Sequence, residues 1–149
     1  WVIQSHIIAM YLPSLISGAL VVRIGVSKMM LLGLLAYVIT IVTALLGHDL
    51  LNYWAALVLL GLGWNFLFVA GTALLPRCYN QDERYKVQAF NDSFVFGAQA
   101  MASLSAGWVI YVLGWEVLLV SCLPLIAALL LLIAWWKLSK SSVLQKERR

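Results

Sequence analysis

The sequence predicts an all-α integral membrane protein with five transmembrane helices, and three observations lead to that fold class. First, 64% of its 149 residues are hydrophobic and only 11% are charged, with a mean hydropathy of +0.96. Second, the apolar residues gather in five runs, each long enough to cross a bilayer as a helix of about 20 residues. Third, the breaks between the runs are short and polar, so no separate soluble domain fits between them.

The five apolar runs define a membrane domain over residues 1–136, followed by a basic tail over residues 137–149. Residue 1 already lies in an apolar run with no basic segment before it, so we expect the sequence to begin inside a longer protein. The last two runs are separated by so few residues that they are expected to form an antiparallel hairpin. The runs cover about residues 1–22, 29–47, 53–75, 88–113 and 117–136.

All ten basic residues lie in the first break, the third break and the tail. With five spans these three segments lie on one side of the membrane, and the positive-inside rule makes that side cytoplasmic. The sequence therefore predicts a cytoplasmic C-terminus. The same distribution accounts for the net charge of +4 as a topology signal, so we expect no nucleic-acid partner. The basic residues are Arg23, Lys28, Arg77, Arg84, Lys86, Lys137, Lys140, Lys146, Arg148 and Arg149.

The five spans differ in polarity, and this difference predicts which way each one faces. The polar positions of the second and fifth spans are groups that a helix can satisfy through its own carbonyls, so we expect both spans to be peripheral and to face lipid. The first, third and fourth spans carry amides, a histidine or a carboxylate, which are costly in hydrocarbon. We therefore expect these three spans to face protein or water.

A polar stripe follows one face of the fourth span, because Gln88, Asp92, Gln99 and Ser103 recur at helical spacing. Asp92 lies about 7 to 8 Å from the cytoplasmic start of the helix at 1.5 Å per residue. It is our gating or coupling candidate, either as a charge latch that accepts an arginine or as a proton-coupling site. Gln99 lies near the midplane and is a candidate for lining a substrate cavity.

Asn65, Phe68 and Thr72 share a face of the third span with Gly61, and Trp64 lies beside Asn65. An amide next to aromatic rings at mid-membrane can hold a small organic solute by hydrogen bonding and stacking. The same amide can instead form an interhelical hydrogen bond that only holds the bundle together. Both interpretations of this substrate or cavity candidate set stay open on the sequence alone.

His6, near the outer end of the first span, also has two interpretations. It is titratable and can take part in ion coupling, or it is a packing histidine whose ring is satisfied by its neighbours. We expect no metal site and no cofactor, because Cys78 and Cys122 have no metal-ligand spacing with either histidine. Signatures of proteases, lipases and ATPases are absent from the sequence, so we expect no enzyme.

The run of residues 18–28, GALVVRIGVSK, resembles the loop signature of major facilitator superfamily transporters, G-x-x-x-D-[RK]-x-G-[RK]-[RK]. Gly18, Arg23 and Gly25 match in place, whereas apolar residues and a serine stand at the aspartate and the following basic positions. The stretch over residues 76–96 looks like the tenth and eleventh helices of a group of bacterial members. Together the resemblance covers nearly the whole chain as the eighth to twelfth helices of a twelve-helix transporter.

The resemblance implies a secondary transporter of the bacterial inner membrane that moves a small solute by alternating access. This chain is then its C-terminal part, and the implied partners are the lipid bilayer, the missing amino-terminal half and a small-molecule substrate. In that fold the tenth helix lines the cavity, the eighth and eleventh meet the other half, and the ninth and twelfth are peripheral. The alternative is a complete five-span scaffold or complex subunit without transport activity.

We predict that a cysteine placed at Gln81 in the full-length protein is protected from a membrane-impermeant thiol reagent added from the periplasmic side, whereas one placed at Asp49 is modified. The reason is that every Lys and Arg lies in a segment assigned to the cytoplasm. The measurement is accessibility labelling in a background that lacks Cys78 and Cys122. Modification at Gln81 but not at Asp49 would reverse the predicted topology.

Overall fold

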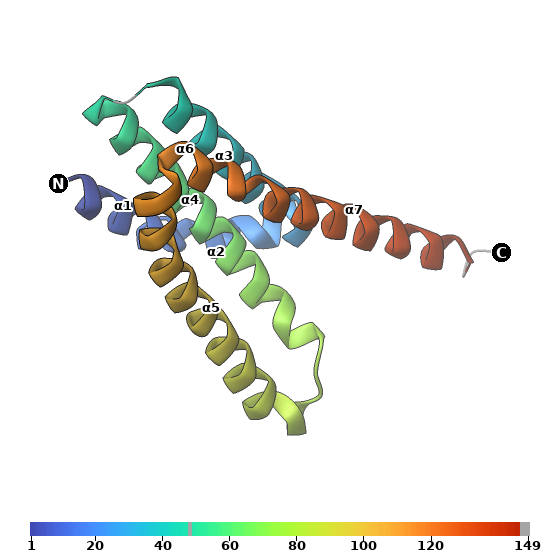
Figure 1. Cartoon of the computed structure of the whole chain (residues 1–149). Coiled ribbons are helices and arrows are strands. Elements are labelled where there is room, and N and C mark those ends of the chain that lie inside the picture. The colour runs from blue at the N-terminus through green and yellow to red at the C-terminus, as the bar shows by residue number, and fades with distance from the viewer. Residues whose placement is uncertain (48, 147–149) are drawn as a thin grey trace.

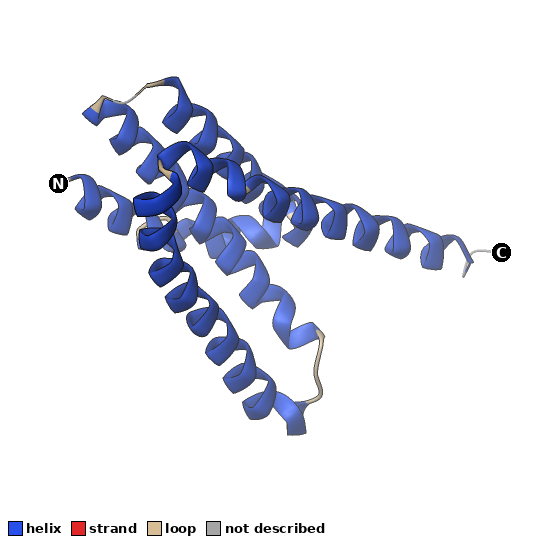
Figure 2. Cartoon of the chain, viewed as in Figure 1, coloured by secondary structure: helices blue, strands red, loops and turns tan. Residues whose placement is uncertain are grey.

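The computed structural model describes residues 1–47 and 49–146, with side chains described as far as Leu138. This part of the chain is helical, with short turns and no strand (Figure 2). Two short 3-10 helices, η1 (Leu75–Arg77) and η2 (Gln81–Glu83), lie between α4 and α5. The α-helices are α1 (Val2–Tyr11), α2 (Ser14–Ile24), α3 (Val26–Leu46), α4 (Leu50–Leu74), α5 (Arg84–Leu113), α6 (Trp115–Ser121) and α7 (Leu123–Lys146).

Four helical segments of the described chain are long and apolar enough to cross a membrane, at Val26–Leu46, Leu50–Arg77, Gln81–Leu113 and Trp115–Leu138. Helices α1 and α2 supply a fifth crossing when the bent pair is counted as one span. The predicted fold class, an all-α membrane bundle with five transmembrane segments, is confirmed in this form.

The first span is broken where the sequence predicted one helix over residues 1–22. Helix α1 ends at Tyr11, α2 begins at Ser14, and the two are bent by 43°. Pro13 explains the break, because its ring removes a backbone donor and clashes with the carbonyl four residues earlier. Hydropathy did not reveal the break, since the chain is apolar on both sides of it.

The first predicted break, residues 23–28, is reduced to a single residue. Helix α2 runs to Ile24, α3 begins at Val26, and only Gly25 separates them. Its φ of 87° and ψ of 154° lie in a region that is essentially restricted to glycine. The glycine of the loop signature therefore makes the turn by itself. Gly114, with φ 89° and ψ 171°, makes the same kind of turn between α5 and α6.

The later spans also differ from their predicted bounds. Helix α4 begins at Leu50 rather than near residue 53, and α5 begins at Arg84 rather than near residue 88. The last span is broken at Cys122, and α7 then continues to Lys146, so most of the predicted tail is helix. The predicted basic residues Arg148 and Arg149 lie outside the described residues, as does His48.

The last two spans do not form the expected antiparallel hairpin. Helix α7 packs against α3, and α5 and α7 diverge from the turn that joins α5 to α6 (Figure 1). A short connection brings two helix ends together, but the helices stay side by side only if their faces pack. Here the apolar face of α7 is buried by α3 instead.

Helices α3 and α4 form the centre of the bundle, and α1 packs along α4. Glycines let α4 approach both neighbours closely. A Cβ on Gly63 would lie 2.6 Å from Cδ1 of Tyr37 in α3, and a Cβ on Gly61 would lie 2.7 Å from the His6 carbonyl oxygen in α1. Two buried apolar clusters complete the core: Leu34, Ile41, Ala44, Ala56, Leu119, Ile126 and Ile133 form one, and Val21, Val26, Met29 and Ala70 form the other.

Helix α5 stands apart from this core, and none of its residues is buried. Within the described chain it contacts mainly α6 and η2, although the sequence predicted the fourth span to face inward. Helix α3, expected to be peripheral, buries one face on α4 and exposes an apolar face. Three members of the polar stripe of α5, Asp92, Gln99 and Ser103, are therefore left exposed by the described residues.

We predict that Gly61→Ala destabilises the full-length protein, whereas Gly71→Ala in the same helix does not. The new Cβ at residue 61 would meet the His6 carbonyl oxygen and Ala9, so α1 must move away from α4, at a cost of about 1–3 kcal/mol for overpacking. At residue 71 no atom lies within 4 Å of the new Cβ. The measurement is thermal unfolding in detergent. Equal melting temperatures for the two variants would contradict the close contact between α1 and α4.

Candidate functional site

Asn65 is the centre of a buried hydrogen-bond cluster that joins α4 to both parts of the first span. Its side chain is only 1% exposed. The Nδ2 group donates to the Met10 carbonyl oxygen at 2.8 Å and to Ser14 Oγ at 2.6 Å. Ser17 Oγ, which is also buried, donates to Asn65 Oδ1 at 2.5 Å. Both N–H donors of the amide are therefore used inside this chain.

The reason for this cluster lies in the break of the first span. Pro13 interrupts the backbone hydrogen bonds at that point, and an unpaired backbone group in hydrocarbon costs several kcal/mol. The Asn65 side chain donates a hydrogen bond to the carbonyl oxygen of Met10, the second-to-last residue of α1. The single hydroxyl proton of Ser17 has two acceptors within reach, Asn65 Oδ1 at 2.5 Å and the Pro13 carbonyl oxygen at 2.8 Å. The Asn65 amide on α4 thus provides a hydrogen-bond donor to the Met10 carbonyl oxygen beside the break and links the bent span to α4.

This geometry bears on the two interpretations of Asn65. A solute that needed an N–H from this amide would have to displace a bond to Met10 or Ser14. The arrangement therefore favours the interhelical hydrogen bond over direct solute binding by Asn65. Within the described residues, Asn65 joins α4 to both parts of the first span.

His6 makes a second link between α1 and α4. Its Nδ1 lies 2.6 Å from the Leu57 carbonyl oxygen, and the side chain is half-buried. Since a carbonyl oxygen can only accept, this bond requires the proton on Nδ1. The geometry fits the packing interpretation of His6 and leaves Nε2 as its remaining polar atom.

Three aromatic rings form a surface next to the Asn65 cluster, and we call Tyr11, Trp64 and Phe68 the aromatic platform. The rings of Trp64 and Phe68 are stacked with centroids 4.7 Å apart and an interplanar angle of 9°. Tyr11 of α1 meets Trp64 edge to face at 5.9 Å. Tyr11 is 60% and Phe68 37% exposed, and Thr72 one turn further along α4 is also exposed. The face shared by the third-span candidates is thus buried at Asn65 and open beyond it.

The sequence did not single out Tyr11 as a site residue. Helical periodicity relates residues within one span, whereas this contact joins two spans. The contact also depends on the place where α1 crosses α4, which the close approach at Gly61 allows.

The candidates on α5 lie elsewhere in the structure. Asp92 is exposed and accepts a hydrogen bond from Asn91 Nδ2 at 3.1 Å. Gln99 is exposed and has no hydrogen bond within the described residues. No hydrogen bond or ring contact in the described part of the chain joins either residue to Asn65 or the aromatic platform. Gln88, at the start of the same stripe, donates instead to Tyr79 Oη at 2.9 Å.

The loop-signature residues take different roles. Gly25 makes the turn between α2 and α3, Arg23 is exposed in the last turn of α2, and Gly18 is an exposed helical position with open space around it. Among the described residues no group of three or more His, Cys, Asp or Glu side chains could hold a metal ion, and Cys78 and Cys122 are free and exposed.

Comparisons with known proteins show that the chain is similar to membrane transporters. The family model described as Major Facilitator Superfamily matches residues 1–148. The riboflavin transporter RfnT of Brucella anthropi is 40% identical over 128 residues, which are 86% of this chain and 32% of that protein. No solved structure matches the chain.

Two uncharacterized MFS-type transporters of Bacillus subtilis are also similar. YdeG is 38% identical over 113 residues, which are 73% of this chain and 26% of YdeG. YddS is 34% identical over 137 residues, which are 91% of this chain and 31% of YddS. The chain therefore spans about a third of the length of these curated relatives. All three are named as transporters, in agreement with the prediction that the chain is not an enzyme.

We predict that Asn65→Ala lowers the stability of the full-length protein by about 1–3 kcal/mol, because it leaves the part-buried Met10 carbonyl oxygen without its side-chain donor. Gln99→Ala is the matched control, since it also removes an amide from a membrane-spanning helix but breaks no hydrogen bond within the described residues. The measurement is thermal unfolding in detergent, together with the amount of protein in the membrane. Wild-type unfolding of both variants would mean that the Asn65 bonds do not hold the bent span.

Proposed function

The chain belongs to the major facilitator superfamily, and we propose that it supplies the eighth to twelfth helices of a secondary transporter that moves a small solute across a bacterial inner membrane by alternating access. The observation that carries this proposal is the broken first span, whose bend is held by the Asn65 cluster. Broken helices beside a midplane site are typical of such transporters, because two packed bodies move around a fixed site.

The proposed substrate is a planar aromatic compound, and riboflavin is the first candidate. One relative, 40% identical over most of this chain, is named a riboflavin transporter. The stacked pair of Trp64 and Phe68 presents aromatic surface next to an exposed hydroxyl at Thr72. A fused-ring solute can extend such a stack, and each well-placed aromatic pair is worth about 0.5–1.5 kcal/mol beyond its buried area.

The proposed partner of α5 is the amino-terminal half of the same transporter. Helix α5 has no buried residue, yet it carries Asp92, Gln99 and Ser103 on one face. Polar groups at membrane depth are tolerated where they face protein or a water-filled cavity. In this arrangement Gln99 lines the cavity, and the C-terminal end of α7 lies in the cytoplasm, as the distribution of Lys and Arg predicts.

Asp92 keeps its two proposed roles. As a latch it would accept a cationic side chain from the other half and hold the cytoplasmic side closed, and Asp92→Asn would then shift the population toward the inward-facing form. As a proton carrier it would be needed only for coupling to the gradient. Preserved counterflow exchange with abolished accumulation in Asp92→Asn would rule out the latch as its main role.

We predict that Trp64→Ala and Phe68→Leu in the full-length transporter each raise the KM for riboflavin uptake by about three- to tenfold, because each removes one aromatic surface from the stack. Trp135→Ala is the matched control, since Trp135 is an exposed tryptophan on α7 and is not one of the rings that stack in the aromatic platform. Uptake is measured in reconstituted vesicles. Equal effects at Trp64 and Trp135 would contradict the role of the platform, and a wild-type protein that moves no riboflavin would contradict the substrate alone.

A further inference from the structure

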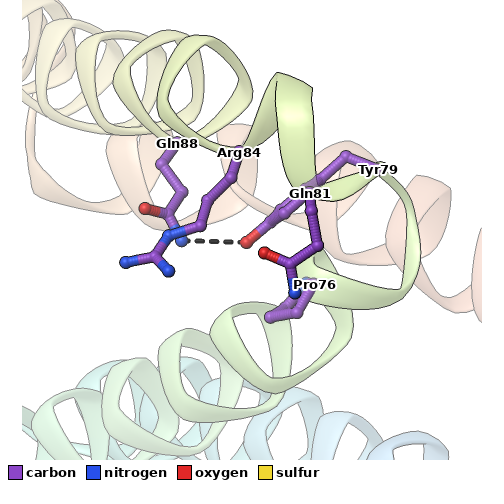
Figure 3. Close-up of a pocket in the computed structure, with 5 residues that line it drawn as sticks. All are labelled: Pro76, Tyr79, Gln81, Arg84 and Gln88. Atoms are coloured by element: carbon purple, nitrogen blue, oxygen red, sulfur yellow. Dashed lines mark hydrogen bonds between the residues drawn. The ribbon is translucent and has the colours of Figure 1, made fainter.

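A pocket lies in the segment that connects α4 to α5 and against the start of α5, and no residue of the aromatic platform lines it (Figure 3). It has a volume of about 310 Å³ and is lined by Pro76, Tyr79, Gln81, Arg84 and Gln88. The two spanning segments that meet there end at Arg77 and begin at Gln81. The pocket therefore lies at the connection between two candidate membrane spans. Its volume is at the low end of the roughly 300–1,000 Å³ of small-molecule sites, so it suits one compact polar group.

The lining of the pocket carries one positive charge and no carboxylate. Arg84 is the only charged residue among those that line it. Its guanidinium lies 5.2 Å from the centroid of the Tyr85 ring, and no ion pair to it occurs within the described residues. Glu83, its neighbour in sequence, accepts a hydrogen bond from the backbone N–H of Asn80 at 3.5 Å in a capping box. The carboxylate nearest in sequence is thus engaged by the loop backbone.

The neutral walls of the pocket are arranged to donate hydrogen bonds. Gln88 Nε2 donates to Tyr79 Oη at 2.9 Å, which fixes both side chains (Figure 3). Because the tyrosine oxygen accepts this bond, its own proton remains free to donate to another group. The side chains of Gln81 and Arg84 lie at the same opening (Figure 3). A guanidinium with additional neutral donors matches the geometry of a phosphate oxyanion, which accepts several hydrogen bonds at once.

We propose that this pocket binds the phosphate group of a phosphate ester at the membrane surface, with Arg84 as the charged partner and Tyr79 and Gln81 as neutral donors. Two sources carry this group. One is the headgroup of an anionic phospholipid, which lies at the depth where the two spans end. The other is a soluble phosphorylated compound. Either ligand would join the segment around Tyr79 and η2 to the start of α5.

The test is ligand binding to the purified full-length protein in detergent, measured by native mass spectrometry with three probes. The probes are phosphatidylglycerol, diacylglycerol with the same acyl chains, and glycerol 3-phosphate. We expect phosphatidylglycerol to bind and diacylglycerol to bind much more weakly, because only the former carries phosphate. Arg84→Gln should weaken phosphatidylglycerol binding by about tenfold or more, and Tyr79→Phe by about threefold.

Arg77→Gln is the matched control. It removes the same charge from the same loop, but Arg77 does not line the pocket, so we expect wild-type binding. If glycerol 3-phosphate alone binds with the same dependence on Arg84, the phosphate site holds and its source is a soluble ester. Equal weakening by Arg77→Gln, equal binding of diacylglycerol, or no binding of either phosphate probe would overturn the proposal. Tyr79→Phe keeps the test informative if Arg84→Gln does not fold.

Discussion

A backbone carbonyl inside a membrane needs a hydrogen-bond donor from the protein, and much of this structure depends on how that need is met at Met10. Pro13 breaks the first span, and the donor that reaches Met10 comes from Asn65 on α4. Ser14 and Ser17 complete the cluster from the other side of the break. The bend in the first span and its attachment to α4 therefore depend on the same hydrogen bonds of Asn65.

That attachment requires α1 and α4 to lie very close together. Gly61 allows the approach, and the His6 bond to the Leu57 carbonyl oxygen reinforces it. On the opposite side of α4, Gly63 packs against α3 in the same way. Small residues bring helix backbones close together in membranes, where dispersion and hydrogen bonding replace the hydrophobic effect as the driving forces. The result is a well-packed unit of α1 to α4, with the aromatic platform at its open edge.

Helices α5 and α7 relate differently to this unit. The second half of the last span is anchored on α3 through apolar side chains, whereas α5 extends from the α6 turn with no buried residue. The polar stripe of α5 and the exposed rings of the platform are two of the surfaces that the described residues leave uncovered. In a family whose members named here are about three times as long, these surfaces are the proposed places for the other half and for the solute. A tightly joined unit beside an uncovered polar helix suits a mechanism in which two bodies move against each other.

The sequence by itself determined that this is a membrane protein. Polar groups are costly in hydrocarbon at every position of a span, so the whole composition is rich in hydrophobic residues and poor in charged ones. Five apolar runs predicted the spans, whereas the sequence marked Gly25 only as part of a family signature and the structure revealed its turn. Only the tertiary structure showed which groups Asn65 contacts within this chain, since an amide at mid-membrane can bind a solute or a neighbouring helix with the same chemistry. It also decided the 43° bend, the addition of Tyr11 to the platform and the pocket around Arg84. The contact of Tyr11 depends on where two spans cross, and helical periodicity contains no information about contacts between spans.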